Sequence, residues 1–146
     1  MKVVLSSPSD LIRGTWQLGG ERVVGEFLLR EHLGQLSQHA ARIEAASTGW
    51  AGGQLALFTS GDVELLMMGL TWDSAEDAQE FVTFYGDLLS STYESEIQEP
   101  PVNSRCWQAD ESICLLVDEQ NVLIVKGPDL ESVTTIASDN SIMSVQ

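Results

Sequence analysis

The run from Val63 to Trp72 constrains the fold of this chain more than any other stretch. Within it, Leu65 to Leu70 is apolar at every position apart from one glycine. A strand with one wet face alternates polar and apolar side chains, whereas a strand that is apolar on both sides needs cover on both faces of its sheet. The cover has to come from helices or from a second subunit, so a homodimer is one arrangement that the run allows.

The residues before this run complete a hairpin. Gln54 to Thr59 reads as a strand, and Ser60-Gly61-Asp62 is a turn sequence. Upstream, Gly49-Trp50-Ala51-Gly52-Gly53 predicts a bend that turns the chain into the hairpin, with Trp50 as a packing anchor. This bend leads into a strand and not into a helix N-terminus, so it lacks the amide and dipole arrangement of a phosphate cradle.

Helix signals follow the hairpin, and the same order of signals occurs twice. Asp73 or Ser74 is an N-cap with an acid three residues later, and an apolar stripe continues to Leu89. A second cap, Asp129, follows three strand candidates at 103–108, 113–117 and 122–125. The repeated order of strand, turn, strand, cap and helix predicts two ββα units in one mostly antiparallel sheet.

Two further helices are predicted near the N-terminus, from Val23 to Leu33 and again from Ser37 to the stop at Gly49. The predicted fold class is α+β: a mostly antiparallel sheet built from two ββα units, with two additional N-terminal helices. The 146 residues suffice for a single domain. Its predicted segments are an extended lead-in (1–22), the helical pair (23–48), the first ββα unit (49–93), a linker (94–102), a second strand-rich unit with its helix (103–138) and a tail that frays (139–146).

The net charge of −15 lies entirely after residue 50, where seventeen acidic residues face only Arg105 and Lys126. Such a field repels nucleic-acid phosphates and anionic lipid headgroups, so we expect no nucleic-acid partner. No run of about twenty apolar residues occurs, so we expect no membrane-spanning segment. A protein partner fits this charge best. The first nine residues are too weakly apolar for a signal peptide, so the chain is either cytoplasmic or already trimmed.

The two cysteines have two readings. Cys106 and Cys114 are symmetric about Asp110, so in a hairpin their sulfurs face each other. A disulfide is then geometrically possible and indicates an oxidising compartment. Two buried free thiols are the alternative. Either way, a pair of cysteines supplies too few ligands for a structural zinc site.

No catalytic, metal or cofactor residue is predicted. The only histidines, His32 and His39, are seven residues apart, which on one helix is roughly 10 Å and too far to share an ion. The chain contains no His-Glu-x-x-His motif, no Gly-x-Ser-x-Gly elbow and no phosphate-binding loop of the Walker type. We therefore predict a protein that is not an enzyme.

Two sets of side chains are candidates for a binding surface. One set is aromatic and either lines a pocket between sheet and helices or belongs to the core, the more frequent outcome at these spacings. The other is acidic, and its helical spacing differs from a calcium-binding loop, so it is either a solvated helix face with capping duties or an interaction face. The aromatic set is Trp50, Trp72, Tyr85 and Trp107, and the acidic set is Asp73, Glu76, Asp77 and Glu80.

The stretch from Gly49 to Gln54, with the helix start Trp72-Asp73-Ser74-Ala75-Glu76-Asp77, resembles a bacterial and archaeal domain whose typical form is Gly-Trp-Gly-Gly-Asp-Arg, a strand and Trp-Asp-Ser. Val24-Gly25-Glu26-Phe27 is similar to its Leu-Gly-Glu-Phe helix start. The resemblance implies a C-terminal domain of secreted or surface zinc-peptidase-like proteins. The metal motif of those proteins is absent here, and Ala51, Gln54 and Leu55 replace the usual glycine, aspartate and arginine.

Three functions follow as hypotheses. The preferred one is a non-catalytic extracytoplasmic module, a surface or accessory domain that binds or supports a neighbour of unknown identity. The second is an intracellular acidic interaction protein that binds a basic partner as a nucleic-acid mimic would. The third is a small-ligand-binding domain that uses the aromatic set.

Overall fold

The structure is a computed structural model that describes residues 2–10, 15–23, 49–93, 95–139 and 142–146. Its main feature is a seven-stranded antiparallel sheet with the order β2-β3-β4-β8-β7-β6-β5. A two-stranded sheet pairs β1 (Val3–Leu5) with β9 (Met143–Val145). The strands of the large sheet are β2 (Gln17–Val23), β3 (Trp50–Ser60), β4 (Val63–Trp72), β5 (Ser95–Glu96), β6 (Ser104–Gln108), β7 (Ser112–Asp118) and β8 (Asn121–Gly127).

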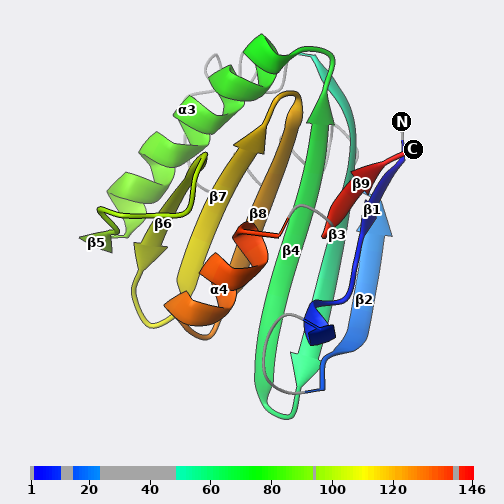
Figure 1. Cartoon of the computed structure of the whole chain (residues 1–146), viewed down its shortest axis with the longest axis vertical. Helices are drawn as coiled ribbons and strands as arrows, with labels where there is room; N and C mark the ends of the chain where they lie inside the picture. Colours follow the sequence, from blue (N-terminus) through cyan, green and yellow to red (C-terminus); the bar gives the residue numbers. More distant parts are fainter. Residues whose placement is uncertain (1, 11–14, 24–48, 94, 140–141) are drawn as a thin grey trace.

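The large sheet is covered differently on its two sides (Figure 1). The helix α3 (Ala75–Thr92) packs on one side, which we call the α3 face, and its core includes Trp72, Phe81 and Trp107. The helix α4 (Leu130–Ala137) and the small β1–β9 sheet pack on the other side, the α4 face. A short 3-10 helix, η1 (Pro8–Asp10), follows β1.

The central strand β4 is apolar on both sides because both sides are inside the protein. Met68, Leu70 and Trp72 belong to the core of the α3 face, while Leu65 and Met67 belong to the core of the α4 face. All five side chains are buried. The cover that the sequence requires therefore comes from the chain itself, and β4 gives no separate reason for a dimer.

The start of α3 fits against the beginning of β3. Ser74 is the N-cap, and its hydroxyl accepts a hydrogen bond from the Asp77 backbone N–H at 3.1 Å. Gly49 has a positive φ of 79° and lies directly against the Asp77 carboxylate, so a side chain at position 49 would collide with it. The Asp73 N–H donates to the Gly49 carbonyl at 2.6 Å. The glycine thus permits a contact that anchors the helix to the hairpin.

The small sheet lies directly on β4 at Gly69. A β-carbon added to Gly69 would lie 2.9 Å from Val3 Cγ1 and 3.0 Å from Leu5 Cδ2. The backbone of β4 can therefore approach β1 closely only because position 69 has no side chain. This contact fixes the distance between the large sheet and the small one.

The prediction of an α+β fold is wrong, because the described residues form a mostly β structure with only two α-helices, one of them C-terminal. Seven strands join in the large sheet, and β2, β5 and β6 add to the strands that two ββα units would supply. No pair of N-terminal helices is present among the described residues. Residues 24–48, most of the predicted helical pair 23–48, lie outside them.

Three local expectations also need correction. The predicted glycine bend is already strand, because β3 begins at Trp50 and only shifts its register between Trp50 and Gly52. The stretch predicted as a linker contains β5, which pairs with β6. The tail predicted to fray contains β9, whose three residues pair with β1.

Candidate functional site

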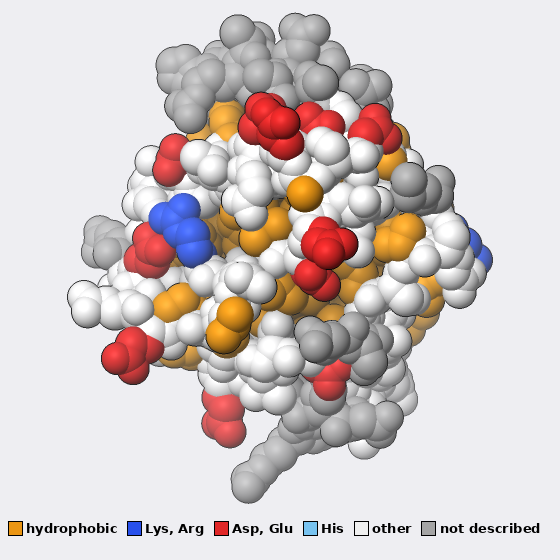
Figure 2. Space-filling model, turned by 45° about the horizontal axis from the view of Figure 1, so that its top comes forward, with side chains coloured by type: hydrophobic (Ala, Val, Ile, Leu, Met, Phe, Trp, Pro, Cys, Tyr) orange, Lys and Arg blue, Asp and Glu red, His pale blue; other side chains and the backbone are white. Residues whose placement is uncertain are grey.

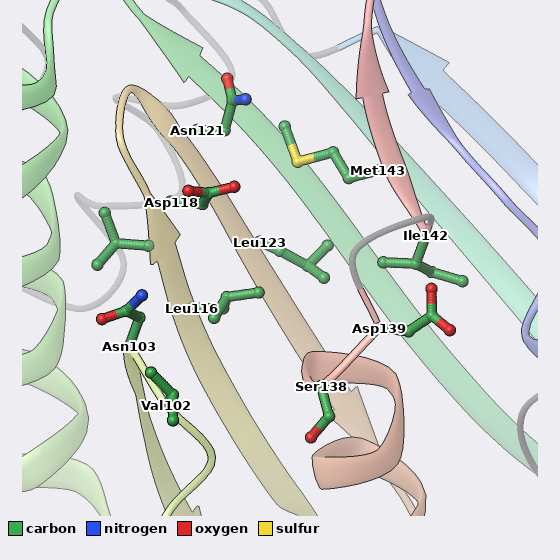
Figure 3. A pocket seen from close by; sticks show the side chains of 11 residues that line it. Val102, Asn103, Leu116, Asp118, Asn121, Leu123, Ser138, Asp139, Ile142 and Met143 are labelled. Atoms are coloured by element: carbon green, nitrogen blue, oxygen red, sulfur yellow. The ribbon is translucent and has the colours of Figure 1, made fainter.

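A groove opens on the α4 face between the end of α4, the strand β9 and the β7–β8 hairpin (Figure 3). We call it the α4 groove. Its volume is about 630 Å³. Leu116 of β7 and Leu123 of β8 form an apolar floor, and Ile142 and Met143 form the wall beside β9. Val102, which is 85% exposed, adds an apolar group at the rim.

The polar rim of the α4 groove is acidic or neutral. Asp118 ends β7, and Asp139 follows α4, so the two carboxylates lie on different elements of the same groove. Asn103 and Asn121 add carboxamides, and Ser138 adds a hydroxyl. No lysine, arginine or histidine is among the lining residues that the structure describes. The groove therefore combines an apolar floor with negative charge and hydrogen-bonding groups.

The two asparagines are held by the fold. Asn103 adopts a positive φ of 62°, a conformation that asparagine tolerates better than most residues, and its carbonyl accepts the Val117 N–H at 3.0 Å. Asn121 Oδ1 accepts the Thr71 hydroxyl at 2.8 Å. This bond leaves the Asn121 amide nitrogen directed toward Met143 and the groove (Figure 3). That nitrogen can donate to a ligand carbonyl.

A second hollow of about 510 Å³ lies along α4, against the segment between β5 and β6. We call it the side hollow. Ile97 and Leu130 are its apolar residues next to the core, while Glu99 and Glu131 are its charged residues. Pro101, Thr134, Thr135 and Ser138 complete the lining.

The space-filling view supports this description of charge and shape (Figure 2). On the face that it shows, hydrophobic side chains lie at the bottom of a hollow and acidic side chains stand beside it. Lys and Arg side chains lie only toward the two sides of the view. A ligand that approaches this face therefore meets apolar surface within a negative field.

The arginine after residue 50 is used by the fold. The Arg105 guanidinium makes two bonds of 2.9 Å to the Glu96 carboxylate and one of 3.2 Å to the Ser90 hydroxyl. It also stacks 5.0 Å from the centre of the Trp107 ring. Hydrogen bonding to Arg105 holds the pKa of Glu96 below its usual value. This network ties β5 and β6 to α3 and leaves no part of Arg105 in either hollow.

The two cysteines are bonded. Cys106 and Cys114 are opposite each other in the β6–β7 register and form a disulfide across the hairpin, fully buried beneath α4. The sequence left open a disulfide and two free thiols, and the structure contains the disulfide. The bond lies in the core of the α4 face and lines neither hollow.

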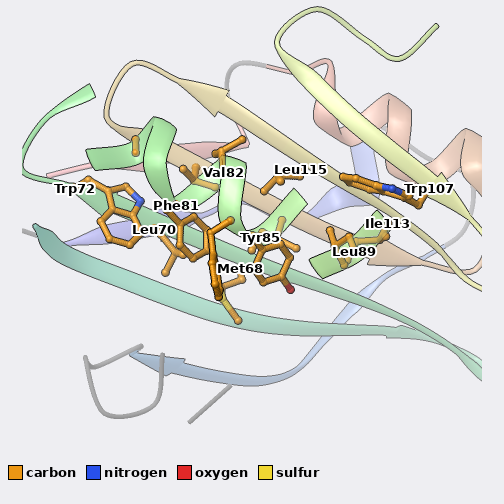
Figure 4. Packing of buried hydrophobic residues seen from close by; sticks show 14 residues of the cluster. Met68, Leu70, Trp72, Phe81, Val82, Tyr85, Leu89, Trp107, Ile113 and Leu115 are labelled. Carbon is orange, nitrogen blue, oxygen red and sulfur yellow. The ribbon is translucent and has the colours of Figure 1, made fainter. Parts of the chain in front are cut away.

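Three of the four aromatic candidates lie in the core of the α3 face (Figure 4). The fourth, Trp50, is partly buried against this core. Trp72, Tyr85 and Trp107 are buried, Trp50 packs on them, and none of the four lines either hollow. Burial, with the nearby Tyr93, raises the pKa of the Tyr85 phenol above its usual range. The indole N–H groups of Trp50 and Trp72 are buried and donate to no acceptor among the described residues. Such an unmet donor costs about 1–3 kcal/mol, which the burial of the two rings must offset.

The acidic candidates start α3. Glu76 and Glu80 are exposed, while Asp77 is half-buried against Gly49 and its backbone N–H is part of the helix cap. Asp73 precedes the cap and is exposed. The four follow one stripe of the first turns, where carboxylates favour the helix dipole. None of the four lines either hollow.

Other candidates remain without a site. Both histidines, His32 and His39, lie outside the described residues. Within the part of the chain that the structure describes, no group of three His, Cys, Asp or Glu side chains could hold a metal ion. The helices of that part are also not long and apolar enough to span a bilayer.

Sequence reasoning missed the α4 groove entirely. Its lining comes from the β5–β6 connection, the β7–β8 hairpin, the end of α4 and β9, segments that are far apart along the chain. The available signals were the asparagines at turn positions and Val102 within a polar stretch. Neither signal reveals that the segments meet in space.

The sequence of residues 15–137 matches a protein family described as Domain of unknown function (DUF8575). The match runs from just before β2 to the end of α4, so the chain belongs to this family. The comparison with curated proteins and the comparison with solved structures found no match.

Proposed function

We propose that the protein is a non-catalytic binding module and that the α4 groove is its recognition site. The observation that carries the proposal is the composition of this groove: a floor of Leu116 and Leu123, and a rim with Asp118 and Asp139 but no basic side chain among its described lining residues. Concave apolar surface with a few convergent polar groups is the usual form of a binding site. The matching ligand group is an aliphatic side chain next to a cation.

Several features support binding over catalysis. A carboxyl group that acts as a general acid or base is commonly buried or held beside another charge. Asp118 is exposed at the end of its hairpin. The groove also has no cysteine or histidine among the residues that the structure describes as its lining. Its hydroxyl, Ser138, caps the end of α4.

We also propose that the module works outside the cytoplasm. The buried Cys106–Cys114 disulfide supports this location, because such bonds persist in oxidising compartments. The resemblance to domains of secreted zinc-peptidase-like proteins favours it too. The test is the mass of the protein from its native source after alkylation without reductant. Protein with both thiols alkylated would refute the proposed location.

The binding proposal is tested with a minimal probe, N-acetyl-leucyl-lysine amide, followed by amide chemical shifts of the labelled protein. We expect concentration-dependent shifts at Leu116, Leu123 and Met143. The matched probe N-acetyl-leucyl-glutamate amide should leave these amides unchanged at the same concentration. Shifts confined to other regions, or equal shifts with both probes, would refute the α4 groove as the recognition site.

A pair of variants separates the groove from general charge. Asp118→Lys reverses a rim charge and should weaken the leucyl-lysine shifts. Asp62→Lys makes the same change in the exposed β3–β4 turn, far from the lining residues, and should leave them intact. The two variants have the same net charge, so a difference between them reports position alone. An equal loss in both would favour the alternative of a diffuse acidic surface that binds basic partners.

A further inference from the structure

The side hollow runs along α4, the α4 groove lies at the C-terminal end of this helix, and the two share one lining residue, Ser138. The side hollow begins beside Leu130 and Glu131 in the first turn of α4. The α4 groove continues past the last turn to Met143. We call the two hollows together the trough.

We infer that this trough holds an extended, basic segment of a partner protein. The inference rests on the proposed function and adds the form and the chemistry of the ligand. A single side chain would occupy only the α4 groove. A ligand that occupies both hollows, which meet at Ser138, has to be an extended peptide segment.

The dimensions of α4 set the length of the segment. An α-helix of eight residues is about 12 Å long. An extended chain advances about 3.3 Å per residue, so about four residues run beside α4. The α4 groove adds the length of its own floor. We therefore choose a hexapeptide as the probe, which leaves about two residues for the α4 groove.

The charge of the trough requires a basic occupant. Glu99 and Glu131 lie in the side hollow, and Asp118 and Asp139 lie in the α4 groove. No lysine, arginine or histidine lines either hollow among the described residues. A peptide with cations spaced along it would find carboxylates at both ends of the trough.

The junction at Ser138 strengthens this requirement. It lies at the C-terminal end of α4, the negative end of the helix dipole, and the last turn of α4 contains no basic residue. Cations are favoured at such an end, and this chain supplies none from the last turn. A lysine or arginine of the partner placed between the two hollows would interact with this helix end.

Apolar and backbone contacts complete the fit. Ile97 and Leu130 in the side hollow, and Leu116 and Leu123 in the α4 groove, offer two apolar positions separated by the junction. The amide nitrogen of Asn121 is directed to the groove side and can donate to a peptide carbonyl. Alternating aliphatic and basic residues match this order of contacts.

The test uses a labelled hexapeptide of three alternating leucine-lysine pairs, with fluorescence anisotropy for affinity and amide shifts for location. We expect tighter binding than that of the leucyl-lysine probe by at least about tenfold, because two sites are joined in one ligand. Shifts should appear beside both Leu130 and Leu123. A leucine-glutamate hexapeptide and a glycine-lysine hexapeptide, each lacking one of the two chemistries, should bind at least about tenfold more weakly.

Charge reversal locates the peptide. Glu131→Lys in the side hollow and Asp118→Lys in the α4 groove should each weaken the leucine-lysine hexapeptide by about fivefold at low salt, and Asp62→Lys should not. All three positions are exposed, and the amide spectrum of each variant reports its folding directly.

The outcomes distinguish the two proposals. If the leucyl-lysine probe shifts the α4 groove but the hexapeptide binds no tighter and Glu131→Lys has no effect, the trough is refuted and the binding module stands. If neither probe produces shifts in the groove, both are refuted. If the leucine-glutamate hexapeptide binds as tightly as its lysine counterpart, the requirement for a basic segment is refuted.

Discussion

The two faces of the large sheet are built in opposite ways. Among the described residues, one helix of eighteen residues covers the α3 face, and its rings fill the space above β4, β8 and β7. Phe81 lies 4.9 Å from the ring of Trp72 and 5.4 Å from that of Tyr85. The α4 face is covered by a helix of eight residues and a two-stranded sheet, and the α4 groove lies where these two end. The difference separates a face closed by aromatic packing from a face that contains the proposed recognition site.

The largest expected effect is on the α3 face. Phe81→Ala removes a fully buried ring and should lower the free energy of unfolding by about 3–5 kcal/mol, measured by denaturant titration. Glu80→Ala, the exposed neighbour in the same helix, should change it by less than about 0.5 kcal/mol. On the other face, Met143→Ala trims a half-buried groove wall and should cost less than about 2 kcal/mol. A larger loss for Met143→Ala than for Phe81→Ala would reverse the comparison.

The disulfide is the next largest contribution and belongs to the α4 face. The double variant Cys106→Ala/Cys114→Ala should lose about 2–3 kcal/mol, because the bond closes a loop with a sequence separation of 8 and restricts the unfolded chain. Denaturant unfolding of the oxidised protein and the variant measures this loss. Identical midpoints would mean that α4 holds the β6–β7 hairpin without covalent help.

Gly69 sets how tightly the small sheet can cover the α4 face. Gly69→Ala should cost about 1–2 kcal/mol, because the added methyl group meets Val3 and Leu5 at contact distances that require a shift. Amide exchange in β1 and β9 should accelerate. Gly20→Ala is the matched control, since nothing lies within 4 Å of a β-carbon at that position. Equal amide exchange rates in β1 and β9 for the two variants would show that the small sheet does not pack against Gly69.

The smallest effect is electrostatic and lies at the edge formed by β5. The folded-state pKa of Glu96 is depressed by its bond to Arg105, so its contribution to stability is present above the usual glutamate pKa of about 4.3 and is lost as the pH falls through the folded value. The side chains of Glu96 and Arg105 are 40% and 35% exposed, so solvent screens the ion pair and its contribution to stability is below about 1 kcal/mol.

Glu96→Gln tests this contribution. Its unfolding free energy should be slightly lower than that of the parent protein at pH 7 and should converge with it in acid. Thermal unfolding of both proteins across the acid range measures the convergence. A constant difference at every pH would show that the bond acts through geometry and not through the carboxylate charge.

The sequence predicted the local elements better than their assembly. The hairpin of β3 and β4, the Ser74 cap and the Asp129 cap are visible because turn and cap chemistry depends on residues close in sequence. β2 was only partly predicted, because its two glycines and its exposed side chains lack the pattern of a buried strand. The small sheet was not predicted, because β1 and β9 stabilise each other only through a pairing between opposite ends of the chain.

The candidate site was the least predictable part. The aromatic residues chosen from the sequence are core residues of the α3 face, as their apolar character alone would allow. The α4 groove depends on a space left between elements, and no residue type encodes a space. The cysteine pair was the exception. Its symmetric spacing indicated a hairpin in which Cys106 and Cys114 are opposite each other, so a disulfide could be named as one of the two alternatives.

The pairing of β1 with β9 has a consequence for biosynthesis. The backbone of Lys2 exchanges hydrogen bonds with that of Gln146, and β1 is synthesised before β9, so β1 can pair only after β9 has been made. Until β9 is synthesised, the small sheet that covers β4 at Gly69 is incomplete. The α4 groove also lacks its wall residue Met143. A nascent chain would therefore form its large sheet before the α4 groove is complete.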